Sequence, residues 1–350
     1  MVTINDVAKE AGVAISTVSN IINGKGNVSQ KTKDKVQRVI DELGYQVDPV
    51  ARRMKNGRSK MVGMIITDFS RIFFAPVIRR CREIASTMGY TLMCVETNDD
   101  FKLEKQHISL MQKNRFDAII LNTVADIDDT EYYQQLRALS YRDKNIPVVC
   151  IERDLASHGL DSVETDNYSG AVKATNHLIS LGCRNIMHIT GPVNSWPAER
   201  RVRGFCETIE EHTDINQQIV LGDFSPYSGY NAVRNIVVNP NKLPFDAIFA
   251  SNDQMAVGAM KALQEMNVEI PEQVCIVGYD DSFVASLIEP SLTSVHVSGS
   301  NIGAEAIRMV LERIEGDAQP ARCGQIDTGL VVRRSTDNDI YVSKDYLNWW

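Results

Sequence analysis

The hydrophobic positions near the amino terminus repeat with the period of an α-helix. Four apolar residues at i, i+3, i+4 and i+7 form one buried stripe of a short helix: Ile4, Val7, Ala8 and Ala11. Thr3 can cap this helix with its side-chain oxygen, and Gly12 can end it, because glycine readily takes the left-handed conformation of a tight turn. A second helix follows with its own apolar stripe, formed by Val18, Ile21 and Ile22.

The opposite face of this second helix is expected to point away from the core, and it carries Ile15, Ser16, Thr17, Ser19 and Asn20. Two short helices joined at a glycine, with small polar residues outside, predict a helix-turn-helix whose second helix can enter the DNA major groove. A plain helical hairpin inside a larger core has the same spacing and is the alternative. Ser29 then begins a third helix that runs to Leu43 and stops at Gly44, which completes a small all-α head over residues 1–47.

The hydrophobic pattern changes twice after the head. Residues 48–60 are basic and nearly free of large apolar side chains, which predicts a linker. From residue 61 short apolar runs alternate with amphipathic helices, and these runs are VGMII, TLMCV, AIIL, PVVCI, NIMHI, AIFA and VCIVGY. Such alternation predicts an α/β region of parallel sheets covered on both faces, and a change of rhythm near Asp161 suggests two sheets. The region is expected to end near residue 335, before a tail of residues 336–350.

Charge is divided unevenly along the chain. The 350 residues have a net charge of −8, but residues 1–60 hold eleven Lys and Arg against six Asp and Glu, a net +5. The remainder carries −13, so only the basic head is expected to meet nucleic acid. Seven scattered cysteines without a CxxC pair favour reduced thiols over a disulfide framework or a zinc site. The polar amino terminus and the lack of a long apolar run predict a cytoplasmic protein without a membrane segment.

One set of motifs runs through the head: the spacing of Ala8, Gly12 and Val18, followed by VSQKTKDKVQRVIDELGY and PVARRM. This set resembles the lactose-repressor and galactose-repressor (LacI) family of bacterial transcription regulators. The resemblance continues in GYTLMCVETNDD, FDAIFASNDQMAVGAMKAL, PEQVCIVGYDDS and PSLTSVHV, and so covers residues 1 to about 335. The resemblance implies that residues 61–335 form two lobes of the periplasmic-binding-protein type with parallel, doubly wound sheets. Crossovers between the lobes are then expected near Asp161, near His296 and near Ile326.

The family motif implies that three side chains of the second helix reach base edges: Ile15, Ser16 and Asn20. The sequence departs from the commonest pattern here, because Asn20 stands where the family usually has Arg, and Ala14 stands where it usually has a capping Ser. Asn pairs with the N6 and N7 edge of adenine, whereas Arg favours guanine, so we expect A·T at the base that Asn20 meets. Phosphate contacts are expected from small polar side chains that could equally be capping or surface groups: Thr3, Thr17, Asn23, Ser29 and Thr32.

Residues 49–56 resemble the family's hinge helix, which orders on DNA and lies in the minor groove. Pro49 fits the first turn of such a helix. Val50, Ala51 and Met54 would share one face, and Met54 stands where the family usually has a leucine that wedges between base pairs. A solvated linker is the plainer interpretation of the same stretch.

Ligands of parallel α/β folds bind at the carboxyl ends of the strands. Side chains that follow the predicted strands and turns form the expected effector site: Asp68, Phe73, Phe74, Glu152, Trp196, Arg201, Phe224, Asn252 and Asp280. Carboxylates, an amide and a guanidinium can hold several hydroxyls, while aromatic faces pack on a ring. The resemblance assigns Arg201, Asn252 and Asp280 to the cleft most directly, and core packing is the alternative for each aromatic residue.

Three residues that stand near the predicted effector residues in the sequence are expected to have other roles. Helix capping and solvent exposure are expected for Asp253 and Asp281, and Arg71 can meet either an anionic ligand group or water. The sequence contains no GxxxxGK loop, no GxGxxG after a strand, no HExxH and no GxSxG, and its six histidines are widely separated. We therefore expect no enzymatic activity, no metal and no cofactor.

Together these features predict a homodimeric repressor that binds a near-palindromic operator in double-stranded DNA and responds to a small molecule in the cleft. A sugar inducer is favoured, and a purine-type corepressor is the alternative effector. A solute-binding protein of a transporter shares the two-lobed fold, but the basic head and the cytoplasmic start argue against it. The Trp349-Trp350 end of the tail has no explanation.

Overall fold

The computed structural model describes residues 2–22, 28–45, 58–142 and 144–340, and the chain divides into two compact units, Met1–Ser59 and Lys60–Trp350. The division falls within the linker predicted over residues 48–60. Four residues predicted to contact DNA lie outside the described residues: Asn23, Val50, Ala51 and Met54.

The described residues of the first unit form three helices, α1 (Ile4–Ala11), α2 (Ile15–Ile22) and α3 (Gln30–Leu43). Six buried side chains form its core: Val7, Ala8, Ala11, Val18, Val36 and Val39. Gly12 and Gly44 end α1 and α3 with φ of 61° each, in the left-handed region where glycine is least strained. The three predicted helices and both glycine stops are confirmed.

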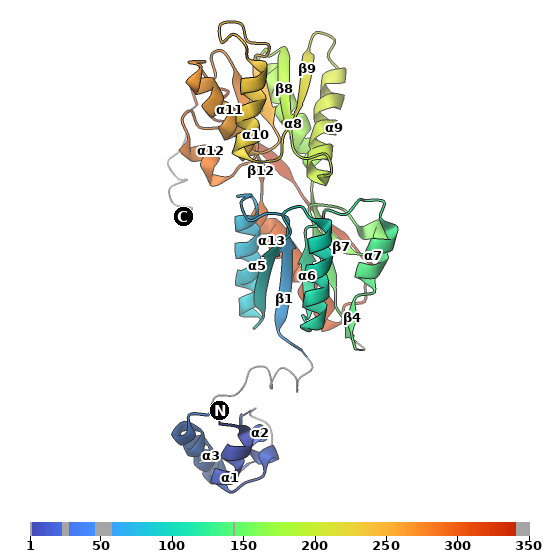
Figure 1. Cartoon of the computed structure of the whole chain (residues 1–350), viewed down its shortest axis with the longest axis vertical. Coiled ribbons are helices and arrows are strands. Elements are labelled where there is room, and N and C mark those ends of the chain that lie inside the picture. The colour runs from blue at the N-terminus through green and yellow to red at the C-terminus, as the bar shows by residue number, and fades with distance from the viewer. Residues whose placement is uncertain (1, 23–27, 46–57, 143, 341–350) are drawn as a thin grey trace. The chain divides into compact units, whose positions relative to one another are not determined.

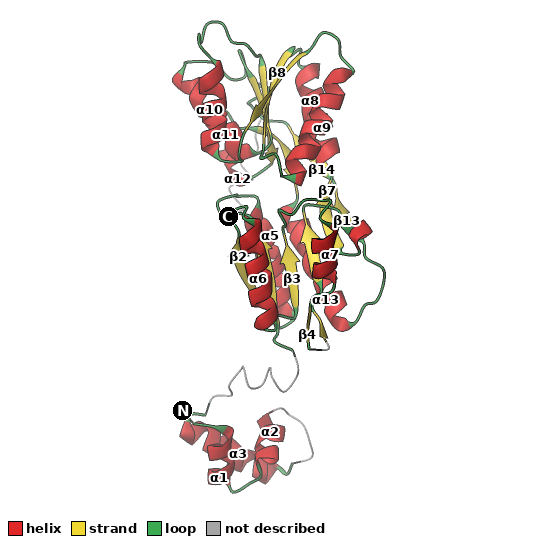
Figure 2. Ribbon diagram, turned by 45° about the vertical axis from the view of Figure 1, so that its right-hand side comes forward, coloured by secondary structure: helices red, strands yellow, loops and turns green. Residues whose placement is uncertain are grey.

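The second unit contains two six-stranded sheets with helices on both faces (Figures 1 and 2). The first sheet, which we call the N-terminal lobe with its helices, has the order β13-β7-β6-β3-β1-β2, and its strands pair in parallel. Its strands are β1 (Met61–Ile66), β2 (Thr91–Glu96), β3 (Ala118–Leu121), β6 (Val148–Ile151), β7 (Asp161–Thr165) and β13 (Cys323–Ile326). Its helices are α5 (Phe74–Thr87), α6 (Phe101–Lys113), α7 (Thr130–Arg137), the short η1 (Ala156–His158) and α13 (Gly299–Glu315), with a hairpin of β4 (Ser140–Tyr141) and β5 (Lys144–Asn145).

The second sheet and its helices form the C-terminal lobe. The strand order is β14-β12-β11-β10-β8-β9, and β14 is antiparallel to β12 while the other pairs are parallel. The strands are β8 (Asn185–Thr190), β9 (Asn216–Leu221), β10 (Ala247–Ala250), β11 (Cys275–Asp280), β12 (Thr293–Val297) and β14 (Thr328–Val331). The helices are α8 (Asn167–Ser180), α9 (Trp196–Glu210), α10 (Pro226–Ile236), α11 (Asp253–Glu265) and α12 (Phe283–Leu287).

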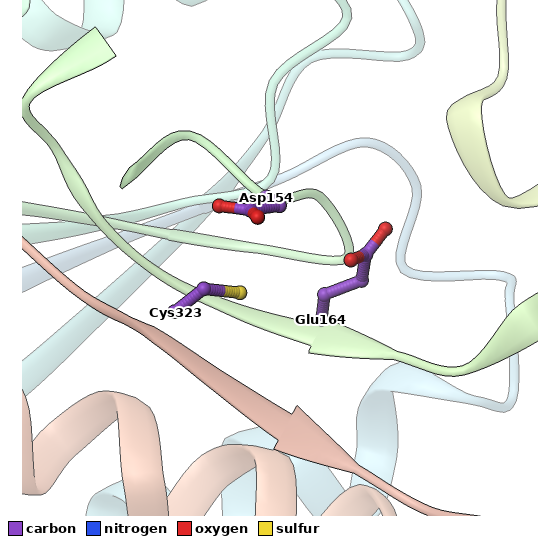
Figure 3. Close-up of side chains that lie close together, drawn as sticks. All are labelled: Asp154, Glu164 and Cys323. Carbon is purple, nitrogen blue, oxygen red and sulfur yellow. The ribbon is translucent and has the colours of Figure 1, made fainter. Parts of the chain in front are cut away.

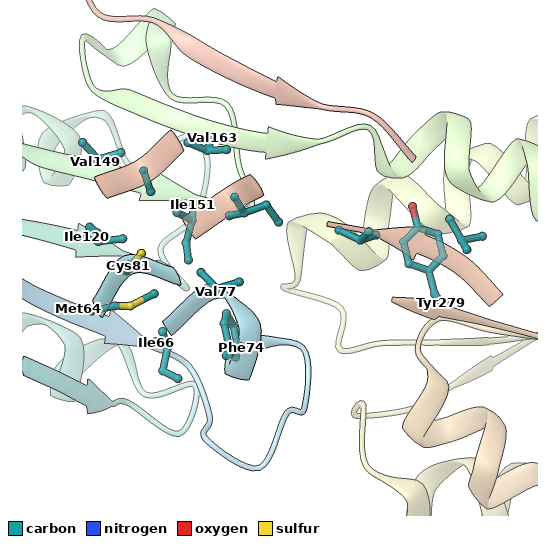
Figure 4. Packing of buried hydrophobic residues seen from close by; sticks show 14 of the residues in the cluster. Met64, Ile66, Phe74, Val77, Cys81, Ile120, Val149, Ile151, Val163 and Tyr279 are labelled. Atoms are coloured by element: carbon teal, nitrogen blue, oxygen red, sulfur yellow. The ribbon is translucent and has the colours of Figure 1, made fainter. Parts of the chain in front are cut away.

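Alternating side chains of β1 explain why helices cover both faces of the first sheet. Met64 and Ile66 pack in the cluster that includes Val77 and Cys81 of α5 (Figure 4). Ile65 points the other way and packs with side chains of α6 and α7. Successive strand residues face opposite sides of a sheet, so a strand buried on both faces is apolar throughout, as the continuous runs predicted.

Within the described residues, the chain passes between the lobes three times, after β7, after β12 and between β13 and β14. These passages follow Thr165, Val297 and Ile326, close to the positions that the family resemblance implied. The predicted α/β fold with two parallel sheets is confirmed, with the antiparallel β14 as an addition at one edge.

Candidate functional site

A cavity of about 320 Å³ lies between the two lobes and is lined by residues at the strand ends of both. Eight of the nine residues predicted for an effector site line it: Phe73, Phe74, Glu152, Trp196, Arg201, Phe224, Asn252 and Asp280. Asp68 is not among the lining residues. The rule that ligands bind at the carboxyl ends of parallel strands therefore predicted a set of residues most of which line one cavity.

Arg201 is the most buried charged residue of the cavity, and Asp280 is the carboxylate that faces it. Arg201 is 3% exposed, and its Nε donates to Asn167 Oδ1 at 2.8 Å, while its Nη1 donates to the Ser251 carbonyl oxygen. The guanidinium also lies 3.7 Å from the centre of the Tyr279 ring. Arg201 Nη2 and Asp280 Oδ1 are 3.6 Å apart, beyond direct hydrogen-bond distance, so both groups can still bind a ligand hydroxyl.

Two carboxyl groups of the cavity have pKa values displaced by their surroundings. Burial raises the pKa of Asp280 well above its usual range, although the Arg201 charge opposes the shift. Burial likewise raises the pKa of Glu152 to about 7, against the opposing charge of Arg201 and a hydrogen bond from Thr165 Oγ1 to Glu152 Oε1 of 3.2 Å. Asp280 and Glu152 have φ of 99° and 67°, conformations that are uncommon outside glycine and that cluster at functional sites.

Asn252 lines the cavity, but both polar atoms of its side chain are hydrogen-bonded to other protein groups. It caps α11, since its Oδ1 accepts from Met255 N at 2.8 Å, and its Nδ2 donates to the Phe224 carbonyl oxygen at 2.9 Å. Phe224, with φ of 70°, is thereby held against the cavity, where its ring lies 5.1 Å from the Arg71 guanidinium.

The aromatic residues combine lining and packing. Phe74 is 4% exposed and belongs to the core cluster, so the core-packing alternative holds for it in part. Phe73 and Phe74 meet edge to face with ring centres 5.4 Å apart. Trp196 begins α9, and its indole Nε1 donates to Glu164 Oε1 at 2.7 Å.

Asp68 was expected in the effector site, but it does not line the cavity. Its short side chain turns back and accepts from Ser70 N at 2.7 Å and from Ser70 Oγ at 2.8 Å, as Asp commonly does in turns. Arg71 lines the cavity in its place, donates to Thr67 Oγ1 at 2.9 Å and pairs with Asp99.

Several lining residues were missed by the sequence reasoning, among them Thr67, Asp99, Asn122, Thr123, Arg153 and Gln254. Asn122 and Thr123 directly follow the predicted run AIIL, and Arg153 follows PVVCI by one residue, so the strand-end rule applied to every run would have found them. Gln254 bridges the lobes, because its Oε1 accepts from Ile72 N at 3.0 Å and its Nε2 donates to the Ser70 carbonyl oxygen at 3.2 Å.

Asp253 and Asp281 are not the solvent-exposed caps that were expected. Asp253 is 1% exposed and accepts from Ser294 Oγ and from Ser282 N, both at 2.6 Å, and burial raises its pKa to about 7. Asp281 accepts from His296 Nδ1 at 2.9 Å and pairs with Arg333 Nη2 at 2.6 Å. Asp253 therefore ties the start of α11 to β12 and to Ser282, and Asp281 ties the end of β11 to β12 and to Arg333.

A second group of side chains lies beside the crossover strands. Asp154, Glu164 and Cys323 hold their oxygen and sulfur atoms within 4.8 Å of one another, and they are the cluster with metal-binding geometry in the described part of the chain (Figure 3). Their atoms already have protein partners: Asp154 accepts from Ala156 N at 2.9 Å, and Glu164 accepts from Trp196 and Gln325. Burial raises the pKa of Cys323 to about 11, which disfavours the thiolate that a metal would need.

On the head, the outer face of α2 presents Ile15, Ser16 and Asn20. Ile15 is 50% exposed, an unusual position for a large apolar side chain, and Ser16 and Asn20 are also exposed. Thr17 is half-buried. Ser19 was expected on this face but is 7% exposed, because it is directed toward the core side of the helix next to Val18.

Thr3 and Ser29 both act at helix ends. Thr3 donates from its N and Oγ1 to Asp6 Oδ2 at 2.8 and 2.7 Å, and the two residues form a capping box at the start of α1. The hydrogen bonds from Thr3 lower the pKa of Asp6. Ser29 Oγ accepts from Thr32 N at 3.3 Å, which confirms it as the cap of α3.

Comparison with known proteins identifies the head and the two-lobed unit. Residues 3–48 match the model of bacterial regulatory proteins of the lacI family, and residues 175–336 match a periplasmic binding protein-like domain. A ribose operon repressor from Halalkalibacterium halodurans is 35% identical over 336 residues, which are 96% of this chain and 97% of the relative. The chain belongs to the lacI family.

Other lacI-family relatives and structures agree. A transcriptional repressor PurR from Haemophilus influenzae is 36% identical over 341 residues, covering 96% of this chain and 98% of the relative. The crystal structure of the Lac repressor dimer bound to operator and the anti-inducer ONPF is 25% identical, covers 96% of this chain and 99% of that chain, and has a TM-score of 0.84. The family assignment confirms a DNA-binding transcriptional regulator, and both relatives are transcriptional repressors. Among the described residues, no helix combines the length and the apolar composition that crossing a membrane requires.

Proposed function

We propose that this lacI-family protein acts in the cytoplasm as a homodimer that binds a near-palindromic operator and represses transcription until a sugar enters its cavity. The observation that carries the effector part is the pairing of buried Arg201 with Asp280 at 3.6 Å inside a cavity lined by both lobes. A hydroxyl group donates one hydrogen bond and accepts others, so it can bridge a guanidinium and a carboxylate that do not bond each other directly.

The size and composition of the cavity support a small polyhydroxylated ligand. Its volume of about 320 Å³ lies near the lower end of the range of roughly 300–1,000 Å³ seen for ligand pockets. Glu152 adds a second acceptor, while Phe73, Trp196 and Phe224 supply aromatic surface for the apolar face of a ring. The ribose operon repressor among the relatives makes pentoses the first sugars to test.

A purine is the second candidate effector. The repressor PurR is as similar to this chain as the ribose operon repressor is, and aromatic rings of the cavity, among them Phe73, Trp196 and Phe224, offer stacking surface to a flat base. In that case the ligand would promote operator binding as a corepressor. The two classes therefore predict opposite effects of ligand on DNA affinity.

For DNA, we infer that α2 enters the major groove and that Ile15, Ser16 and Asn20 contact base edges. Their exposure on one face of a short helix supports this role, since none of them is needed in the core. Contacts to phosphates are assigned to Thr3, Thr17, Asn23 and Ser29, and minor-groove contacts to Val50, Ala51 and Met54. The assignments at Asn23 and in the hinge rest on the sequence alone.

The effector acts through differential affinity for two arrangements of the lobes. A ligand held by Glu152 in one lobe and by Arg201 and Asp280 in the other favours the closed arrangement. If closure alters the dimer that aligns two heads on DNA, the operator-bound state loses population when a sugar binds. Two heads on successive half-sites also explain why dimerisation is needed for tight and specific binding.

The experiment is a selection of bound duplexes from a random pool with the full-length protein, followed by fluorescence anisotropy on the selected operator. We expect a palindromic site with A·T at the base contacted by Asn20, and release of DNA by one of a set of pentoses and hexoses. Tighter binding with hypoxanthine or guanine would instead support the purine alternative. Selection of no specific duplex, with or without these compounds, would contradict the proposed function.

A further inference from the structure

Trp196 is connected across the lobes by its indole nitrogen. The residue belongs to α9 of the C-terminal lobe and lines the cavity. Its partner Glu164, which Figure 3 shows, belongs to β7 of the N-terminal lobe. The bond from Nε1 to Glu164 Oε1 is 2.7 Å long, and Glu164 is 9% exposed. Because the indole has a single donor and the acceptor is a sheltered carboxylate, this is one of the stronger kinds of side-chain hydrogen bond.

Glu164 is itself held by the other crossover strand. Gln325 of β13 stands directly opposite Glu164 in the parallel register, and its Nε2 donates to Glu164 Oε2 at 3.4 Å. The two oxygens of the carboxylate thus serve different partners, one on each side of the lobe boundary. Both β7 and β13 lead straight into passages between the lobes, so this carboxylate lies where a relative movement of the lobes changes the backbone.

Two guanidinium groups further restrict the Trp196 ring. Arg200 lies 4.9 Å and Arg153 lies 5.9 Å from its ring centre, distances at which a cation is attracted to an aromatic face. Arg153 is 5% exposed and is fixed in turn, because its Nη1 donates to the Ala125 carbonyl oxygen at 2.5 Å and to the Tyr133 hydroxyl at 2.8 Å. The two guanidinium groups thus restrict the position of the Trp196 ring, and the hydrogen bond to Glu164 restricts the direction in which its N–H points.

We propose that Glu164 is a positioning residue of the effector site. By accepting the indole N–H, it fixes the Trp196 ring as one wall of the cavity and couples the orientation of that wall to the crossover strands β7 and β13. A relative movement of the lobes would then also change the orientation of the Trp196 ring toward a ligand. The part of this inference that concerns a ligand rests on the proposed function, whereas the orientation of Trp196 by Glu164 is testable without any ligand.

The first experiment uses Trp196 as its own probe. The chain has three tryptophans, so the full-length W349F/W350F protein retains Trp196 as its single tryptophan. In this background and without ligand, Glu164→Ala and Glu164→Asp should shift the emission to longer wavelength and increase quenching by acrylamide. The aspartate keeps the charge but withdraws the carboxylate by one methylene, and Glu164→Gln, which keeps an acceptor in reach, should restore the original spectrum.

Asp154→Asn is the matched control, because it removes a carboxylate from the same cluster without touching a Trp196 bond (Figure 3). Far-ultraviolet circular dichroism establishes that each variant is folded. If folded Glu164→Asp leaves the emission and the quenching of Trp196 unchanged, or if Asp154→Asn changes them equally, Glu164 does not orient the ring. Glu164→Asp keeps this test available if Glu164→Ala does not fold.

The second experiment measures release of the selected operator by the sugar identified for the unmodified protein. Glu164→Ala and Glu164→Asp should raise the half-effective sugar concentration about tenfold, the usual consequence of losing a hydrogen bond to a charged group, and Glu164→Gln should not. Equal sugar concentrations for all variants would overturn the coupling to the ligand. If no compound affects the unmodified protein, the proposed function fails while the fluorescence result still decides the role of Glu164.

Discussion

The outer face of α2 and the wall of the cavity are both proposed to recognise a partner, but their side chains are held very differently. Ile15, Ser16 and Asn20 are exposed on one helix face and contribute nothing to the small core of the head. Arg201 and Glu152 are 3% and 5% exposed and are fixed by protein partners. Specificity for DNA can thus change by substitution without loss of stability, whereas a change in the cavity disturbs both recognition and folding.

The largest effect is expected from Arg201→Ala. The change leaves buried Asp280 without its cation, and removing one member of a buried pair typically costs about 3–5 kcal/mol of unfolding free energy. Effector binding should be lost as well, because the guanidinium is part of the proposed hydroxyl site. Denaturant unfolding and calorimetric titration with the identified effector measure the two effects.

Arg203→Ala is the control for this prediction. Arg203 lies on the same helix with its side chain 53% exposed, and it pairs with Glu207 one turn away at 2.8 Å. Its removal should leave stability and effector binding nearly unchanged. Normal effector affinity in folded Arg201→Ala would place the ligand elsewhere and break the contrast between the two surfaces.

Glu152→Gln should change how stability depends on pH. Burial raises the pKa of Glu152 to about 7 in the folded protein, above about 4.3 in an unfolded chain. The folded state therefore holds this proton more tightly, so its contribution to stability is complete below about pH 4 and is lost as pH rises through about 7, a loss of about 4 kcal/mol. Glutamine does not titrate, so the decline of unfolding free energy between pH 5 and pH 8 should be shallower in the variant.

Asp253 titrates in the same direction, with a pKa that burial raises to about 7, so part of the decline should persist in Glu152→Gln. Denaturant unfolding of the unmodified protein and of Glu152→Gln at several pH values separates the contribution of Glu152 from the contribution that remains, which includes Asp253. An identical decline in the variant and the unmodified protein would show that Glu152 is not held in a desolvated site.

Asn20→Arg tests the other surface. Because Asn20 is exposed, stability should change by no more than about 0.5 kcal/mol. Preference at the contacted base should move from adenine to guanine by about 1–3 kcal/mol, since arginine binds the O6 and N7 acceptors of guanine. Competition between two duplexes that differ at this one base pair measures the shift, and Asn20→Ala should weaken binding to both without a new preference. A guanine preference in the unmodified protein would exclude the assigned contact.

The two surfaces also differ in how far they could be predicted from the sequence. Helical spacing and Gly12 were enough to place the outer face of α2, apart from Ser19. In the cavity, the rule that ligands meet strand ends found residues that directly follow an apolar run. Asp68 does not line the cavity, because its carboxylate accepts from Ser70 in a turn, and nothing in the run of apolar residues predicts this turn.

Strands with polar residues were the main omission in the fold. β9 reads NQQIVL and is largely exposed, and β13 reads CGQI, so neither has the continuous apolar run that marks a buried parallel strand. Buried polar partners were equally invisible. Glu104 of α6 is 0% exposed and accepts from Thr123 Oγ1 at 2.7 Å and Val124 N at 3.0 Å, a role that only the packed structure defines.

The smallest expected effect comes from Ala14→Ser at the start of α2. The Ala14 carbonyl oxygen accepts from Thr17 N at 2.9 Å and from Val18 N at 3.2 Å, but alanine has no side-chain oxygen for the free amides of the first turn. Ser29 provides such an oxygen for α3, so serine at position 14 should stabilise the head by about 1 kcal/mol and Ser29→Ala should destabilise it similarly.

Hydrogen exchange of amides in residues 2–45 of the full-length protein measures the stability changes caused by Ala14→Ser and Ser29→Ala. Unfolding of the whole chain would not separate these changes from the stability of the two-lobed unit. Exchange in the two-lobed unit serves as the internal reference. An unchanged exchange rate in Ala14→Ser would show that the helix end is already satisfied. A slower exchange rate with unchanged operator preference would show that α2 can be stabilised without a change in DNA specificity. The cavity is expected to differ, because its side chains are bonded to the core and contribute to both stability and recognition.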